Sequence, residues 1–291
     1  MSQAELPAGE NTKDQTDPQA SGQFEDKDDR YRRLEREWQN EIGHELLDGP
    51  HEDIGSARVF KSQFHRIIEQ IDLTQAGLVA EVGCGKGHFL AELQDAASQC
   101  GSAVKALGID VSKAVDALPE KGLTGICADG EALPFADGAL KALVYDGALH
   151  HLIDYESAVR EAYRTLQPGG QMILFEPVSS VFSRTVHRLL DPIIFEEVEY
   201  ESPIDQEYKD HFREEKVIAT LQQLGMKYTY RRTDFLAYPL TGCYAGSIFS
   251  RWPKFMLILL RIEKICEKVP VLRQIAAFFS WRFLLVAEKP Y

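Results

Sequence analysis

The chain has 291 residues, of which 44% are hydrophobic, and this is enough for one large domain with appendages around a sizeable core. Its formal net charge of -13 argues against a surface that neutralises phosphates, so we expect no nucleic-acid partner. The five cysteines are scattered and form no CxxC pair or Cys/His cluster, so we expect neither a disulfide framework nor a bound metal.

The sequence also predicts that the chain does not span a membrane and is not exported. Its N-terminus lacks a basic region followed by an apolar run. The apolar run at residues 255–260 is far shorter than the ~20 residues of a transmembrane helix. Together with the scattered cysteines, these features predict a soluble, cytoplasmic protein in a reducing compartment.

Two segments precede the first predicted strand. Residues 1–30 are acidic and poor in large apolar side chains, which predicts a disordered tail. Residues 31–76 are a predicted helical cap, because apolar side chains recur there at three- and four-residue steps. These side chains are Tyr31, Leu34, Trp38, Ile42 and Leu46, followed by Val59, Phe60, Phe64, Ile67, Ile68 and Ile71. The cap either packs plainly on the core or roofs a ligand site, and both interpretations stay open.

Strands and helices alternate between residues 78 and 177, and a main domain is expected over residues 77–291. We expect strands at 78–82, 104–109, 123–128, 140–145 and 171–175, and helices at 87–98 and 155–166. Ser112 can cap a further helix after the second strand. Such alternation predicts an α/β fold with a parallel sheet and right-handed crossovers.

The C-terminal third adds a predicted helix at 214–224 and strands at 227–234 and 281–288. Between these strands, residues 239–280 form an apolar and aromatic insertion, expected as two helices broken at Pro270. The insertion is either an extra helical layer on the core, or a greasy pocket and peripheral membrane contact for a lipid-like ligand. The second interpretation rests on basic residues among the apolar ones: Arg251, Lys254, Arg261, Lys264, Lys268 and Arg273.

A glycine-rich turn follows the first predicted strand and opens a helix. Gly83, Gly85 and Gly87 allow a tight turn and leave amide groups exposed at the helix start. Dinucleotide enzymes space their third glycine after two intervening residues, whereas here only Lys86 intervenes. Glu81, two residues before the turn, would repel a pyrophosphate but suits a ligand with ammonium and sulfonium charges.

Three acids stand at the ends of consecutive predicted strands. Asp110 is placed to accept hydrogen bonds from ribose hydroxyls, and Asp129, followed by Gly130, to accept from an adenine amino group. Asp146 ends the fourth strand. Ligands of open α/β sheets bind at this carboxyl edge, so we expect these acids to line a binding site.

Residues 78–177 resemble the class I S-adenosylmethionine-dependent methyltransferases of the small-molecule group. The resemblance rests on VAEVGCGKG at 79–87, LGID at 107–110, ADGEALPF at 128–135, DGALHHL at 146–152 and LQPGG at 166–170. It implies a Rossmann-like, doubly wound sheet of seven strands in the order 3-2-1-4-5-7-6, with the last strand antiparallel. It also implies methyl transfer by in-line attack, with S-adenosylmethionine as the cofactor and a small molecule as the acceptor.

The resemblance places the cofactor residue by residue. Gly83 and Gly85 would face the methionine portion, Asp110 the ribose and Asp129 the adenine, while the backbone near Asp146 would hold the amino group. The match covers about a third of the chain, so the acceptor is not specified by it.

His151 and, less strongly, His150 are the candidate catalytic bases, because they follow the fourth strand and titrate near neutrality. The alternative is that they brace the loop. Glu176 could bind an acceptor or pack at its strand end. Two rival functions stay open: a protein that binds the cofactor without transferring the methyl group, and an NAD(P)-dependent oxidoreductase.

Overall fold

The computed structural model describes residues 26–43, 54–178, 212–241 and 252–291. The expected disordered tail therefore lies largely outside the described residues, as does part of the 239–280 insertion. The first helix, α1 (Lys27–Trp38), begins inside the segment assigned to the tail and continues as a single π-helical turn, η1 (Gln39–Gly43). No helix among the described residues is long and apolar enough to cross a membrane.

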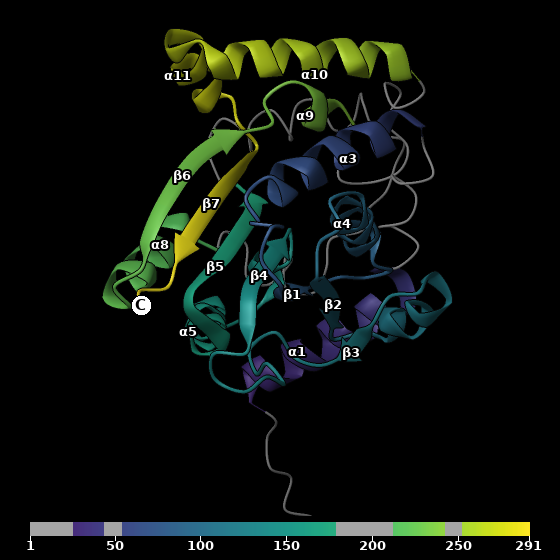
Figure 1. Ribbon diagram of the computed structural model, residues 1–291, viewed down its shortest axis with the longest axis vertical. Coiled ribbons are helices and arrows are strands. Elements are labelled where there is room, and N and C mark those ends of the chain that lie inside the picture. Colours follow the sequence, from purple (N-terminus) through teal and green to yellow (C-terminus); the bar gives the residue numbers. More distant parts are fainter. Residues whose placement is uncertain (1–25, 44–53, 179–211, 242–251) are drawn as a thin grey trace, which may run out of the picture.

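A seven-stranded sheet in the order β3-β2-β1-β4-β5-β7-β6 forms the centre of the molecule (Figure 1). The strands are β1 (Gly77–Val82), β2 (Val104–Asp110), β3 (Gly125–Cys127), β4 (Leu140–Asp146), β5 (Leu166–Pro177), β6 (Lys227–Thr233) and β7 (Arg282–Glu288). The pairs from β3 to β5 are parallel, and β7 is antiparallel to both of its neighbours. The predicted α/β class, strand order and antiparallel last strand are confirmed.

Helices cover both faces of the sheet, and the central strands β1 and β4 are therefore buried on both sides. On one face, α5 (Tyr155–Thr165) and α8 (Glu214–Gln223) pack through apolar residues such as Val159 and Leu221. On the other face, α3 (Ile54–Ile68) and α4 (His88–Gln99) pack through residues such as Ile67 and Leu90. The short helices η2 (Lys113–Ala117) and η3 (Pro119–Lys121) link β2 to β3, and the Ser112 hydroxyl caps η2 by accepting from the Ala114 amide.

The helices near the C-terminus form an outer layer beyond α3 (Figure 1). α9 (Ala237–Thr241) follows β6, and α10 (Pro253–Lys268) and α11 (Pro270–Phe278) precede β7. The predicted break at Pro270 is confirmed. Met256 and Leu260 of α10 pack with Val59 of α3 and Tyr238 of α9 in a small apolar cluster. The insertion thus includes an extra helical layer on the core.

β5 begins five residues earlier than its predicted start at residue 171. Leu166 pairs with Leu140 of β4, with an irregularity before the regular register resumes. Residues 167–170 are held in the strand because the Gly169 amide donates to the Lys289 carbonyl and the Lys289 amide to the Gly170 carbonyl. These partners come from the far end of the chain, so local propensity does not indicate them.

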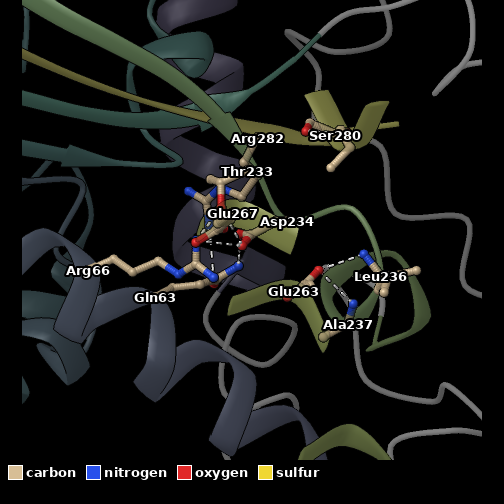
Figure 2. A network of polar contacts seen from close by, with 11 residues as sticks. Gln63, Arg66, Thr233, Asp234, Leu236, Ala237, Glu263, Glu267, Ser280 and Arg282 are labelled. Carbon is tan, nitrogen blue, oxygen red and sulfur yellow. Dashed lines mark hydrogen bonds and ion pairs between the residues drawn. The ribbon is translucent and has the colours of Figure 1, made fainter. Parts of the chain in front are cut away.

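A buried polar network fastens α10 to the body of the protein (Figure 2). Oε1 of Glu263 accepts from the Leu236 and Ala237 amides at 2.6 and 3.0 Å. Oε1 of Glu267 lies 2.5 Å from Nη1 of Arg66, which is buried on α3. Both acids of α10 therefore point into the protein rather than towards solvent.

Burial, and secondarily the nearby Asp234, raises the pKa of Glu263 to about 7. A carboxyl group whose pKa is raised by folding stabilises the folded state fully below its unfolded pKa, near 4.5, and loses that contribution as pH rises through its folded pKa. We expect Glu263→Gln to abolish this part of the pH dependence, because an amide does not titrate. Its oxygen can still accept from both backbone amides, so the anchoring of α10 is kept. Wild-type stability should fall between pH 5 and pH 8 by about 2–3 kcal/mol more than that of the variant.

Urea unfolding at pH 5 and pH 8 measures the difference. Glu120→Gln is the matched control, since Glu120 is exposed and should leave the wild-type pH dependence intact. An equal pH dependence in wild type and Glu263→Gln would contradict the assignment.

Candidate active site

The glycine-rich turn connects β1 to α4 at the carboxyl edge of the sheet. Gly83 and Gly85 have φ of +74° and +47°, a conformation that favours glycine. A Cβ on Gly83 would lie 2.4 Å from Cβ of Ala148, whereas one on Gly85 would have open space around it. Gly83 therefore lets the loop that follows β4 pack closely against the turn, and Gly85 leaves the backbone of the turn accessible to a ligand.

Asp110 at the end of β2 organises the turn beside it. Its Oδ2 accepts from the Gly85 amide at 2.8 Å, and its Oδ1 accepts from the amide and hydroxyl of Ser112 at 2.9 and 2.6 Å. A carboxylate offers about four acceptor positions, so Oδ2 keeps capacity for one further donor. Asp129 follows β3, and its Oδ1 accepts from the Glu131 amide at 2.9 Å.

Glu81 lies on β1 beneath the turn and is 5% exposed. Its Oε2 has no hydrogen-bond partner among the described residues. Burial, reinforced by the charges of Asp146 and Asp110, raises the pKa of Glu81 well above its usual range. A buried acceptor without a partner is unfavourable, so this carboxyl group would be stabilised by a cationic or hydrogen-bond-donating ligand.

A cavity of about 320 Å³ brings nearly all of the predicted site residues together. From these predictions, its lining includes Glu81, Gly83, Gly85, Asp110, Asp129, Gly130, Asp146, His150 and His151. Gly87 is not among the lining residues and instead occupies the N-cap of α4 with φ +76°. The carboxyl edge thus forms one acidic cavity, and the third glycine serves the start of the helix.

Asp146 ends β4 and forms a buried ion pair that the sequence does not indicate. Its Oδ1 lies 2.5 Å from Nη2 of Arg282, the first residue of β7. Arg282 also donates to the Phe175 carbonyl, and its guanidinium stacks 4.1 Å from the ring centre of Phe175. Burial would lower the pKa of this arginine, but Asp146 and other nearby anions hold it above its usual range. The Asp146 carboxylate is therefore engaged by the protein.

Glu176 at the end of β5 braces the loop after β4. Its Oε1 accepts from the Ala148 and Leu149 amides at 3.0 and 2.9 Å, and its Oε2 lies 2.8 Å from Nδ1 of His150. Burial alone would raise the pKa of Glu176, but His150 and the backbone donors hold it below its usual range. Of the two roles considered for Glu176, contact with an acceptor and packing, these bonds favour a structural one. They likewise favour bracing for His150.

Helix α1 lies over the cavity and contributes charged contacts to it. Arg32 lies 2.8 Å from Oε2 of Glu131, and Glu35, only 6% exposed, lies 3.5 Å from Nδ1 of His151 in η4 (Leu149–His151). Residues of α1 and η1 also line the cavity. Of the predicted cap, α1 and η1 thus roof the site, whereas α3 packs on the sheet and lines the cavity with Phe60 and Phe64, so each of the two interpretations holds for one part of the cap.

The sequence did not indicate several residues of the cavity wall. Aromatic side chains line it from segments outside the recognised motifs: Trp38, Phe60, Phe64 and Tyr238, together with Phe89 of α4. The first three were expected on apolar helix faces, so their pattern predicted burial but not exposure to a cavity. Arg282 also lines the cavity, and a charge inside the apolar run 281–287 was the signal that could have identified it.

Comparison with known proteins identifies the central part of the chain. Residues 80–174 match a family described as a methyltransferase domain. A demethylmenaquinone methyltransferase of Corynebacterium urealyticum is 30% identical over 122 residues, which are 42% of this chain and 50% of that protein. The biotin biosynthesis bifunctional protein BioHC of Saccharophagus degradans is 35% identical over 100 residues, 34% of this chain and 18% of that protein.

A solved structure shares the fold over most of the chain. It is a SAM-dependent methyltransferase from Archaeoglobus fulgidus, with a TM-score of 0.52 and 16% identity over 82% of this chain and 97% of that one. The chain spans half or less of the length of the two curated relatives. Residues 80–174, which run from β1 to β5, therefore match a methyltransferase domain, and the same segment holds the motif residues within the shared fold.

Proposed function

We propose that this protein binds S-adenosylmethionine in the acidic cavity and transfers its methyl group to a small, hydrophobic acceptor. The observation that carries the proposal is the convergence of Glu81, Gly85, Asp110 and Asp129 on one cavity within a class I methyltransferase domain. The demethylmenaquinone methyltransferase named above supports methyl transfer, although the chain covers only half of its length.

The residues present fit a cationic methyl donor. S-adenosylmethionine supplies an electrophilic methyl carbon on a positively charged sulfur, and it also carries an ammonium group. Glu81 has a buried oxygen without a partner, and the other acids of the cavity add negative potential. Asp110 keeps acceptor capacity for one ribose hydroxyl rather than the two that the sequence suggested. A nicotinamide dinucleotide would bring its pyrophosphate against these acids, which disfavours the oxidoreductase alternative.

The aromatic wall supports a hydrophobic acceptor. Trp38, Phe60 and Tyr238 line the cavity from α1, α3 and α9, all outside the matched residues 80–174. The two curated relatives match in the shared domain, yet one is named for demethylmenaquinone and the other for biotin biosynthesis. Acceptor choice is therefore expected to lie outside the shared domain, where the aromatic side chains supply flat, apolar surface beside charged residues such as Arg32 and Glu35.

His151 is our candidate for the group that removes a proton from the acceptor. It lines the cavity, and the Glu35 carboxylate lies 3.5 Å from its Nδ1. A carboxylate near one imidazole nitrogen stabilises the protonated form of the ring. The acceptor atom would form its bond to the methyl carbon as the bond to sulfur breaks, leaving a neutral thioether, while its proton passes to His151.

We expect Asp110→Ala to weaken S-adenosylmethionine binding by about 1–3 kcal/mol, because it removes a charged acceptor facing the ribose. Isothermal titration with S-adenosylmethionine and S-adenosylhomocysteine measures the loss. Asp95→Ala is the matched control, since Asp95 is exposed on α4 and does not line the cavity. Equal affinities in Asp110→Ala and wild type would overturn the placement of the cofactor.

Turnover separates a methyltransferase from a protein that only binds the cofactor. Release of S-adenosylhomocysteine should depend on an added acceptor, with aromatic and lipid-like compounds outperforming polar ones of equal size. Cofactor binding without release for any acceptor would favour the binding-only alternative. The cytoplasmic location and the lack of a nucleic-acid partner stay predictions.

A further inference from the structure

Helices α10 and α11 expose a continuous set of large apolar side chains. Ile258, Ile262 and Ile265 follow one face of α10 at steps of four and three residues, and Ile265 is 60% exposed. On α11, whose only buried residue is Ala276, the exposed apolar residues are Val271, Leu272, Ile275 and Phe278, with Phe279 just beyond. Trp252, directly before α10, is 61% exposed. We call these residues the apolar face.

The exposed charged residues that α10 and α11 contribute beside the apolar face are all basic. The exposed charged residues of α10 and α11 are Lys254, Arg261, Lys264, Lys268 and Arg273. The only acids on these helices, Glu263 and Glu267, contact α9, β6 and α3 instead (Figure 2). At 100° per residue, the four basic residues of α10 fall along one side of its isoleucine row. A chain with a net charge of -13 thus presents a locally cationic, apolar surface.

We propose that the apolar face is a docking surface for an anionic lipid bilayer. The exposed aromatic and aliphatic side chains suit the acyl chains of a bilayer. The lysine and arginine side chains beside them suit the acidic headgroups. An exposed tryptophan at the border suits the interfacial region. The surface is held rigid from behind, because Met256, Leu260 and the two acids of α10 anchor the helix to the protein.

A second copy of this chain is a poorer occupant for the same face. A twofold interface places the same patch on both partners, so two cationic surfaces would face each other. Like charges opposed in this way disfavour association. Negative headgroups instead neutralise the basic side, and they let the isoleucine row enter the apolar layer.

The proposal also places the membrane near the cavity wall. Tyr238, which lines the cavity, packs in the same apolar cluster as Met256 and Leu260 of α10. A bilayer bound at α10 would therefore lie one helical layer from the site. This placement suits a lipid-like acceptor, but the docking itself does not depend on methyl transfer.

Flotation of the full chain with phospholipid vesicles tests the proposal. The protein should float with vesicles of phosphatidylcholine and phosphatidylglycerol at 3:1, stay at the bottom with phosphatidylcholine alone, and detach as NaCl is raised. The triple variant Arg261→Gln, Lys264→Gln, Lys268→Gln should partition about 100-fold less, since each basic residue near an anionic surface contributes about fivefold. Ile262→Ser with Ile265→Ser should also lower partition, because it removes insertion into the apolar layer.

The matched control replaces three exposed basic residues elsewhere, Lys105→Gln, Lys227→Gln and Arg231→Gln, at the same cost in net charge. It should partition like wild type. Circular dichroism verifies that every variant is folded. The proposal is overturned if wild type does not float with anionic vesicles, or if the control loses as much partition as the α10 variant. It is also overturned if sedimentation shows a wild-type dimer that the isoleucine variant dissociates.

Discussion

Replacement of Arg282 by methionine is expected to lower the free energy of unfolding by about 3–5 kcal/mol. The substitution leaves the Asp146 carboxylate buried without its cation, at the position where Arg282 Nη2 lies 2.5 Å away. It also removes the stacking of the guanidinium on Phe175 and a hydrogen bond to the Phe175 carbonyl. Methionine keeps the apolar stem of the side chain and lacks the guanidinium, so a double variant is needed to separate the loss of charge from the loss of volume.

Urea unfolding measures the effect, and two further variants define its cause. Arg231→Met is the matched control, because Arg231 lies exposed on the adjacent strand and should change stability by no more than about 0.5 kcal/mol. Asp146→Asn combined with Arg282→Met should recover part of the loss, since no unpaired charge is then buried. A stability of Arg282→Met within about 1 kcal/mol of wild type would show that the pair is not desolvated.

The Arg282–Asp146 pair marks the limit of what this sequence predicts. Asp146 could be placed at the carboxyl edge because it ends an apolar run in a recognised motif. Its partner lies 136 residues later and on the antiparallel last strand, so nothing local connects the two. The strand order brings them together: β4 and β7 both pair with β5. A long-range contact of this kind follows from topology and not from spacing.

The glycine turn and the acids at 110 and 129 were predictable for the opposite reason. Each stands within a few residues of an apolar strand end, and parallel strands bring their carboxyl ends to one edge. Gly87 was assigned to the ligand because it belongs to the same run of glycines. The structure gives it a local task instead, because the N-cap of α4 needs its positive φ, and a Cβ there would lie 2.9 Å from Leu123.

The acceptor side of the cavity was the least predictable. A helix face of apolar residues indicates that those residues are buried, but not whether they touch the core or a cavity. For Trp38 and Phe60 the sequence could not distinguish these two cases. In the structure both line the cavity, and α1 lies across the carboxyl edge through the contacts of Arg32 and Glu35. Polar contacts thus help to hold α1 over the site, whereas the apolar face of α3 holds the second cap helix on the sheet.

Replacement of Glu176 by alanine is the second large effect that we expect. Two buried backbone amides, Ala148 and Leu149, would lose their acceptor, and His150 would lose its carboxylate partner. Each unsatisfied buried donor costs about 1–3 kcal/mol, so the free energy of unfolding should fall by about 2–5 kcal/mol. Urea unfolding at pH 7 measures this loss. Glu176→Gln should lose less, because its amide oxygen can still accept from the two amides.

The pH dependence of the free energy of unfolding distinguishes the charge of the Glu176 side chain from its size and shape. Folding lowers the pKa of Glu176, so its ionised form stabilises the folded state above its unfolded pKa, near 4.5. That contribution is lost as pH falls through the lower, folded pKa. Wild type should therefore lose stability below about pH 4.5 more steeply than Glu176→Gln, which has no such proton to bind. An equal change of the free energy of unfolding with pH in both proteins would contradict this account. It would mean that His150 and the backbone donors do not hold the carboxylate ionised, so its charge would not stabilise the loop that carries His151.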